Sequence, residues 1–257
     1  MQLTDDEIRE ILIKQKKRKR RQQRMRRRIT LLFIVILIIG AAVTVLVMHS
    51  RGNGVGILPA KGVIFIDPGH GGSDPGSASD GRNEKDDNLV FAIAVKKALA
   101  RQGFRVIMSR TGDEDVERAR RGELANESGA QLMVSFHRNK SNGKGQGVEV
   151  FIPSDSSRES QLLGMSVFDA LISCGFKERS IRTGTLESEK EDYEELAAAE
   201  MPCCLVEVGF IDNKDDNKLF DDNLRTNAKA VATAINDTFT ELYAPEEAEK
   251  AEESAEQ

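Results

Sequence analysis

Cysteine is scarce in this chain of 257 residues, which contains only Cys174, Cys203 and Cys204. Three cysteines do not form a disulfide framework, and their spacing is not the Cys-x-x-Cys spacing of a zinc site. Cys203 and Cys204 lie in an apolar run, which favours buried thiols that act as small hydrophobic side chains. We therefore assign no chemistry to the cysteines.

A surplus of positive charge is missing after the first 28 residues, where acidic residues outnumber lysine and arginine. Residues 1–28 carry a formal charge of +8, so the total of −5 leaves −13 for the rest of the chain. An acidic main domain argues against nucleic acid as a partner. The length and the hydrophobic content of 39% predict one globular domain with room for a segment at each end.

Charge is missing altogether from residues 29–48, "ITLLFIVILIIGAAVTVLVM". As a helix, this run would reach about 30 Å, the thickness of the hydrocarbon core, and we predict a transmembrane helix. A cleaved signal peptide is the alternative, but the run exceeds the usual apolar core and no Ala-x-Ala-like site follows it. The basic segment 1–28 predicts a cytoplasmic N-terminus, with everything after Met48 outside the cell membrane.

Two further segments flank the main domain. Residues 49–61 are rich in glycine, and we interpret them as a linker between membrane and domain. Residues 244–257, "APEEAEKAEESAEQ", are acidic and lack aromatic residues and an apolar face, so a disordered tail is expected. The domain itself is predicted to span residues 62–243.

Strand and helix patterns alternate through this domain. Apolar or β-branched runs predict strands at 63–66, 104–110, 130–139, 147–152, 181–186 and 202–210. Helical spacing predicts helices at 84–103, 115–127, 157–173 and 221–243, with one or two turns at 192–200. This order predicts a single α/β domain with a mostly parallel twisted sheet flanked by helices.

The first strand ends abruptly at Asp67-Pro68-Gly69, and His70 follows between glycines. Glycines let the backbone approach whatever the imidazole binds, so a metal ligand is one interpretation. A structural turn is another. A phosphate-binding loop would require the lysine and the serine or threonine of GxxxxGK[ST], and neither stands at the required position.

Three more side chains occupy similar places. His137 ends a predicted strand, Glu207 lies near the end of another, and Glu84 opens the helix after the His70 loop. Sites in parallel α/β sheets form beyond the carboxyl ends of the strands, so these groups can converge. Two histidines and one carboxylate around Zn²⁺, with the fourth position left to water, form a catalytic zinc site, and a further carboxylate can take the proton of that water.

Each residue also has an ordinary interpretation. Glu84 can be an acid that favours a helix N-terminus, and His137 a satisfied core histidine. Asp67 can support a liganding histidine or simply end a strand. Glu207 is harder to explain in this way, because an unpaired carboxylate in an apolar strand costs several kcal/mol.

Six segments together resemble a known family. They are "IDPGHGGSDPGS", "EKDDNLVFAIAVKKAL", "RTGDEDVERARRGELAN", "LMVSFHRN", "GVEVF" and "CLVEVGFIDN". In this order, between Lys61 and Tyr243, they resemble the zinc-dependent N-acetylmuramoyl-L-alanine amidases of the amidase-3 type. The resemblance implies that His70, Glu84 and His137 are zinc ligands and that Glu207 is the catalytic glutamate.

The resemblance also implies an activity: hydrolysis of the amide between N-acetylmuramic acid and L-alanine of the peptidoglycan stem peptide. Two alternatives stay open, a catalytically silent peptidoglycan-binding or regulatory module and a zinc amidohydrolase acting on a different amide. A single catalytic domain after a hydrophobic segment is similar to the sporulation and germination amidases, and the need for an activator protein is left open. Arg138 departs from the small residue that the family often has there, which suggests altered substrate contacts beside the metal.

Overall fold

A computed structural model describes residues 60–155 and 157–255 of the chain. The predicted basic segment 1–28, the transmembrane helix 29–48 and nearly all of the linker 49–61 lie outside the described residues. Among the residues that are described, no helix is both long enough and apolar enough to cross a membrane.

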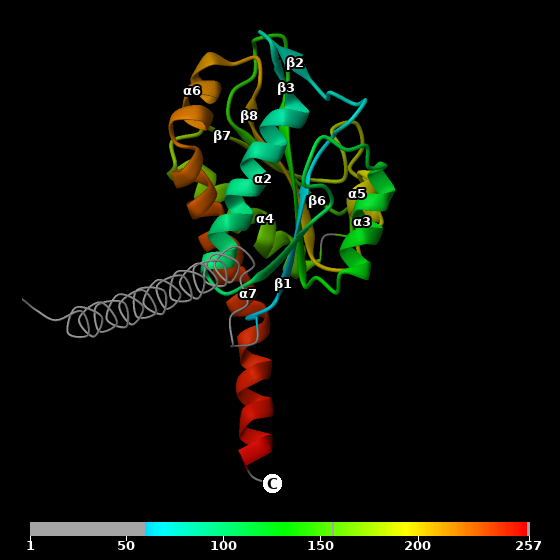
Figure 1. Cartoon of the computed structure of the whole chain (residues 1–257), viewed down its shortest axis with the longest axis vertical. Helices are drawn as coiled ribbons and strands as arrows, with labels where there is room; N and C mark the ends of the chain where they lie inside the picture. The colour runs from blue at the N-terminus through cyan, green and yellow to red at the C-terminus, as the bar shows by residue number, and fades with distance from the viewer. Residues whose placement is uncertain (1–59, 156, 256–257) are drawn as a thin grey trace, which may run out of the picture. The chain divides into compact units, whose positions relative to one another are not determined.

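A six-stranded sheet forms the centre of the domain (Figure 1). Its strands, in spatial order, are β4 (Arg105–Met108), β1 (Val63–Pro68), β5 (Leu132–Asn139), β8 (Cys203–Phe210), β6 (Val148–Ile152) and β7 (Glu178–Thr183). The first four are parallel, β6 is antiparallel to β8, and β7 is parallel to β6. A small hairpin of β2 (Ala78–Ser79) and β3 (Arg82–Asn83) stands apart. The predicted α/β class with a mostly parallel sheet is confirmed.

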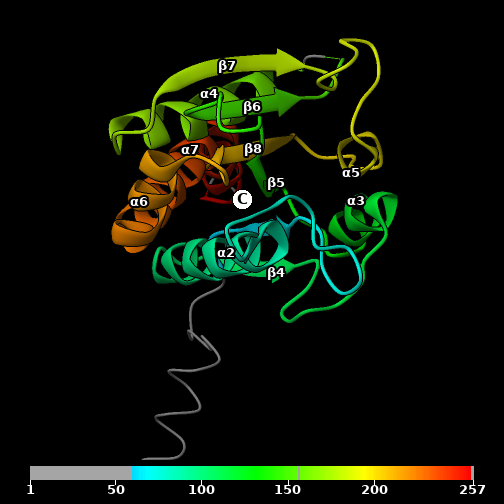
Figure 2. The ribbon, with the colours of Figure 1, turned by 90° about the horizontal axis from the view of Figure 1, so that it is seen from above.

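Helices cover both faces of this sheet (Figure 2). One face carries α2 (Glu84–Arg101), α4 (Arg158–Ser173), α6 (Lys214–Asp222) and α7 (Leu224–Ala255). The other carries the shorter α3 (Arg118–Glu127) and α5 (Glu194–Ala197). Side chains alternate along a strand, so Ile64 and Ile66 enter the larger core under α2, whereas Phe65 enters the smaller core under α3 and α5.

Helix α6 was not predicted from the sequence. Its residues, "KDDNKLFDD", are mostly charged, and Phe220 is its buried hydrophobic side chain. The helix begins because Oδ1 of Asn213 accepts hydrogen bonds from the backbone N–H groups of Asp215 and Asp216. The capping residue was the signal available in the sequence.

The last helix differs from the prediction at its end. We expected disorder over residues 244–257, but α7 continues to Ala255. The segment is rich in alanine and glutamate, which have high intrinsic helix propensity. Extending an existing helix also avoids the cost of nucleating one, so the lack of an apolar face does not stop it.

Candidate metal centre

The register of the sheet places two of the predicted residues side by side. His137 on β5 pairs with Glu207 on β8, and Glu207 in turn pairs with Glu149 on β6. Strand alternation turns these side chains toward the face that carries α3 and α5. A histidine and two carboxylates thus form a row across the middle of the sheet.

His70 approaches His137 from the loop that follows β1. Its φ of 59° is in the left-handed region, which is unusual for a residue with a side chain. Gly69 lies against the imidazole of His137, where a Cβ atom would be only 2.1 Å from Nε2 of the ring. Any side chain at position 69 would therefore displace His137.

Two buried arginines hold the His70 loop in this conformation. Arg110 donates from Nε to the carbonyl of Pro68 and from Nη2 to that of Gly69, both at 2.9 Å. Arg121 donates from Nη1 to Pro68 and from Nη2 to the carbonyl of His70, also at 2.9 Å. No role was predicted from the sequence for either arginine: Arg110 ends a predicted strand, and Arg121 occurs in a charged run that resembles a solvated surface.

Of the two interpretations left open for Asp67, direct support of a liganding histidine has no hydrogen bond behind it among the described residues. Within the described chain its carboxylate accepts hydrogen bonds from Ser109 (2.5 Å), Ser135 (2.6 Å) and Arg121 (2.7 Å). Burial alone would raise the pKa of Asp67, but the charge of Arg121 and these hydrogen bonds hold it below its usual range. The carboxylate therefore anchors the loop through Arg121.

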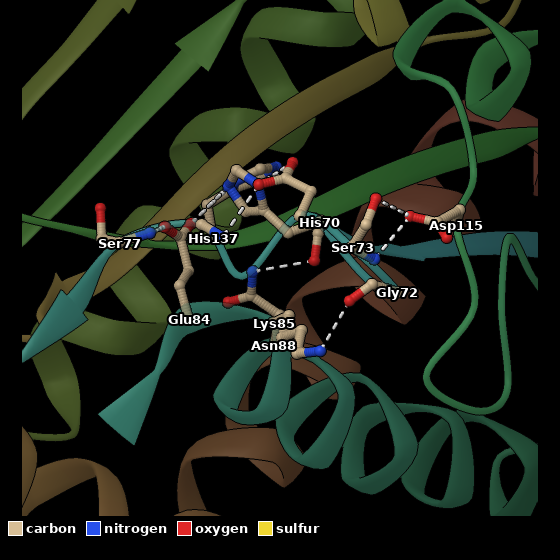
Figure 3. Close-up of polar contacts among 12 residues, drawn as sticks. His70, Gly72, Ser73, Ser77, Glu84, Lys85, Asn88, Asp115 and His137 are labelled. Atoms are coloured by element: carbon tan, nitrogen blue, oxygen red, sulfur yellow. Dashed lines mark hydrogen bonds and ion pairs between the residues drawn. The ribbon is translucent and has the colours of Figure 1, made fainter. Parts of the chain in front are cut away.

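The two imidazoles converge on one carboxylate oxygen (Figure 3). Oε1 of Glu84 lies 3.1 Å from Nε2 of His70 and 2.9 Å from Nδ1 of His137. The rings meet edge to face, with their centroids 4.8 Å apart. One ligand atom from each of the three residues lies within 4.8 Å of the others. Two imidazoles and one carboxylate are a donor set that suits zinc.

Glu84 is more than an acid at a helix N-terminus, since only 3% of it is exposed. Its Oε2 accepts from the backbone N–H of Ser77 at 2.8 Å, and its Oε1 from that of Arg138 at 3.1 Å. Burial alone would raise its pKa, but hydrogen bonds with His137 and His70 bring the pKa of Glu84 well below the usual range. The carboxylate is fixed in its ionised form, as a metal ligand must be.

In each histidine, the ring nitrogen that does not face Glu84 lies near a second carboxylate. Nδ1 of His70 lies 2.7 Å from Oδ2 of Asp74, and Nε2 of His137 lies 3.6 Å from Oε1 of Glu195. Neither Asp74 nor Glu195 was predicted from the sequence as a site residue. Asp74 follows His70 by four residues in the same loop, which was an available signal. Glu195 lies on a helix of four residues, and no pattern in the sequence indicated its burial.

Glu207 has an unusual environment for a carboxyl group. Its Oε2 is buried and has no hydrogen-bond partner among the described residues. Burial, together with the negative charge of Glu84, raises the pKa of Glu207 to about 8. A cation held beside Glu84 would favour the carboxylate and lower this value. Such a group is suited to accepting and releasing a proton near neutral pH.

An open pocket of about 830 Å³ contains these groups. His70, Glu84, His137 and Glu207 all line it, together with Tyr193 and further polar residues. The structure thus brings all four predicted site residues into one cavity. Its volume is in the range of ligand-binding clefts.

Arg138 does not have the predicted role in substrate contact. Its side chain is 1% exposed and lies on the opposite face of β5 from His137. Nη1 binds Asp87 at 2.7 Å, Nη2 binds Asn217 at 2.6 Å, and the guanidinium lies 4.3 Å from the ring centroid of Phe220. Only the backbone N–H of Arg138 contacts the metal centre, through Glu84.

Comparison with known proteins gives consistent matches. The model of the family Amidase_3, described as N-acetylmuramoyl-L-alanine amidase, matches residues 64–237. The chain is 36% identical over 160 residues to the sporulation-specific N-acetylmuramoyl-L-alanine amidase of Bacillus subtilis (strain 168), covering 61% of this chain and 59% of that protein. It is 35% identical over 156 residues to the N-acetylmuramoyl-L-alanine amidase CwlM of Bacillus licheniformis, with 60% and 58% covered. The chain therefore spans less than two thirds of each relative.

A solved structure is similar as well. The crystal structure of N-acetylmuramoyl-L-alanine amidase from Clostridium difficile 630 superimposes with a TM-score of 0.64 and 28% sequence identity. The match covers 70% of this chain and 97% of that structure. The similarity includes the central sheet and the helices on both of its faces.

Proposed function

The chain belongs to the Amidase_3 family of N-acetylmuramoyl-L-alanine amidases, and we propose on that basis that it is a zinc-dependent peptidoglycan hydrolase. The bond cleaved is the amide between N-acetylmuramic acid and L-alanine of the stem peptide. The observation that carries the proposal is the convergence of His70, Glu84 and His137 in one pocket with the buried acid Glu207.

The residues present fit a zinc ion. His70 and His137 offer one ring nitrogen each, and the ionised Glu84 offers an oxygen between them. Zinc bound there would polarise the amide carbonyl and make a water molecule more acidic. The open side of the pocket leaves room for both the amide and that water.

Glu207 is the residue that moves the proton. As a carboxylate it takes a proton from the attacking water, and as an acid it returns that proton to the nitrogen of the leaving amine. The product is an L-alanine amino terminus on the released peptide. Oε2 of Glu207 has no hydrogen-bond partner in the described part of the chain, which supports this role because no donor from these residues competes for that oxygen.

We further propose that the catalytic domain works outside the cell, anchored by residues 29–48 with residues 1–28 in the cytoplasm. Peptidoglycan lies on that side of the membrane, which makes the two proposals consistent. Cysteine labelling of intact cells tests the orientation: Ser50→Cys should react with an impermeant maleimide, and Ser254→Cys should react equally.

Nucleic acid is not an expected partner. A role in sporulation or germination is supported by the relative from Bacillus subtilis.

The activity is tested by mass spectrometry of the products released from purified peptidoglycan by the full-length protein. Free stem peptides that begin with L-alanine are expected, and both a chelator and Glu207→Gln should abolish their release. Binding to the wall without release, by zinc-replete folded protein, would indicate the silent binding module. Release of other products would indicate a different amide. Addition of cell extract to an inactive sample tests whether an activator protein is required.

A further inference from the structure

The imidazole of His137 and the carboxyl group of Glu195 face each other as an incomplete pair. Nε2 of His137 and Oε2 of Glu195 are buried and have no hydrogen-bond partner among the described residues. Oε1 of Glu195 is 3.6 Å from that Nε2, just beyond hydrogen-bond distance. Only 3% of Glu195 is exposed, so burial of its carboxylate costs free energy unless the carboxylate is paired with a hydrogen-bond donor.

The position of Glu195 is fixed from outside the metal centre. A Cβ atom on Gly122 would lie 2.5 Å from the carbonyl oxygen of Glu195, so α3 and α5 touch through a residue without a side chain. Asn126 of α3 clamps the end of α5, because its side chain binds the carbonyl of Ala198 and the N–H of Glu200, both at 2.9 Å. Helix α5 therefore presents its carboxylate to the site as part of the scaffold.

His70 shows what such a carboxylate does. Its Nε2 faces Glu84 while its Nδ1 is paired with Asp74 at 2.7 Å. In His137 the nitrogens are exchanged: Nδ1 faces Glu84 and Nε2 faces Glu195. A proton on Nε2 leaves the lone pair of Nδ1 free for a metal, so a carboxylate beside Nε2 selects the tautomer that can bind.

We propose that Glu195 is a positioning residue that accepts a hydrogen bond from Nε2–H of His137 and so holds the ring with Nδ1 ready for zinc. The proposal rests on the zinc site proposed above. Asp67 also lies near His137 and Glu195, but it is not available for this role because Arg121 and two serines already occupy its oxygens. Closing the gap requires a movement of about 0.5 Å, which a small shift of the ring provides.

Zinc affinity tests the proposal in the full-length protein, by competition with a chromogenic chelator. We expect Glu195→Leu to weaken zinc binding about 10–100-fold, the usual effect of losing such a partner. Glu195→Gln keeps an oxygen acceptor and should recover part of the loss, because a neutral hydrogen bond has about half the strength of a charged one. The matched control is Glu194→Gln, which removes the same charge from the exposed neighbour on α5 and should bind zinc as the unaltered protein does.

A spectroscopic measurement separates positioning from simple packing. The chain has three histidines, so NMR of protein with ¹⁵N-labelled histidine gives few signals to assign. In the zinc-loaded protein we expect a proton on Nε2 of His137 that exchanges slowly with water, and this signal should disappear in Glu195→Leu. Unchanged affinity and an unchanged Nε2–H signal in Glu195→Leu would overturn the proposal, as would an equal loss in Glu194→Gln. Failure of the unaltered protein to bind zinc would instead reject the proposed function itself.

Discussion

Two consecutive residues, His137 and Arg138, separate two very different polar regions at the end of β5. On the side of His137, three carboxyl groups lie close together, because Glu84, Glu195 and Glu207 all line the pocket. On the side of Arg138, opposite charges alternate. Arg138 binds Asp87, Asp87 binds Arg82, and Arg82 binds Asp221 at distances of 2.7–2.9 Å for the ion pairs.

The difference shows which region can be stable without a ligand. Alternating charges compensate one another inside the protein, whereas gathered carboxylates repel one another unless a cation or a proton joins them. Both regions use the first turn of α2, since Glu84 belongs to the pocket and Asp87 to the ion-pair network. The network formed by Arg138, Asp87, Arg82 and Asp221 therefore supports the helix end that carries Glu84, a proposed metal ligand.

Removing the base from the pocket should have the largest effect. Glu207→Gln keeps the size of the side chain but cannot take a proton, so we expect kcat on peptidoglycan to fall about 10²–10⁴-fold. Zinc content, measured on the same sample, should stay unchanged because Glu207 is not one of the three proposed ligands. A variant that retains activity would show that another group acts as the base.

Breaking the network at its buried end should mainly affect folding. Arg138→Met removes the donor to Asn217 Oδ1 and leaves Asp87 paired with Arg82 alone. The loss of one member of a buried ion pair costs about 3–5 kcal/mol, and we expect a loss toward the lower end of this range because Arg82 remains. Urea denaturation measures this loss in the free energy of unfolding. Arg120→Met, which removes an exposed arginine from α3, is the control and should change the midpoint little. Equal stabilities of the two variants would show that the buried network contributes no more to stability than the ion pairs of Arg120.

In the metal-free protein, a substitution in the pocket should stabilise the fold, whereas Arg138→Met destabilises it. The pKa of Glu207 is raised to about 8 from its ordinary value of 4.5, so this group binds more protons in the folded than in the unfolded state between these values. The contribution of Glu207 to the free energy of unfolding therefore falls as pH rises from 4.5 toward 8. Glu207→Gln lacks this group and should be more stable than the unaltered protein by about 1–4 kcal/mol at pH 8, with a smaller difference at pH 5.

Thermal denaturation at the two pH values checks this prediction. Added zinc should reduce the difference at pH 8, because a cation beside Glu84 lowers the pKa of Glu207. A difference that is the same at both pH values would mean that Glu207 is not protonated in the folded state.

The exposed end of the network should contribute least. Asp221 pairs with Arg82 at 2.7 Å, but its side chain is 54% exposed and the pair is screened by water. Asp221→Ala should cost about 0–1 kcal/mol, and less in high salt. Denaturation midpoints in low and high salt measure the effect. A cost like that of Arg138→Met would show that the network acts as one unit.

The sequence allowed the parts of the site that depend on strand periodicity to be predicted. His137 and Glu207 were identified because polar residues near the ends of apolar strands are unusual, and the sheet pairs them directly. Glu84 was found from its place at the start of a long helix. These signals are local, and a fixed alternation of side chains converts them into positions in space.

The remaining residues could not be predicted because their roles depend on tertiary contacts. Arg121 and Arg138 have the same appearance in the sequence as solvated arginines, yet both are almost completely buried. The direction of Arg138 could have been inferred from alternation beside His137. The burial of Glu195 depends on the close approach of α3 and α5 at Gly122, which no periodic pattern records.

The place of β8 in the sheet has a consequence for the order of folding. This strand lies between β5 and β6, although both precede it in the chain. A ribosome therefore releases all three predicted metal ligands, and both neighbouring strands, before the strand that joins them exists. Pairings between such distant segments form slowly. Glu207 arrives with this last central strand, so the three predicted metal ligands are synthesised before the residue proposed as the base.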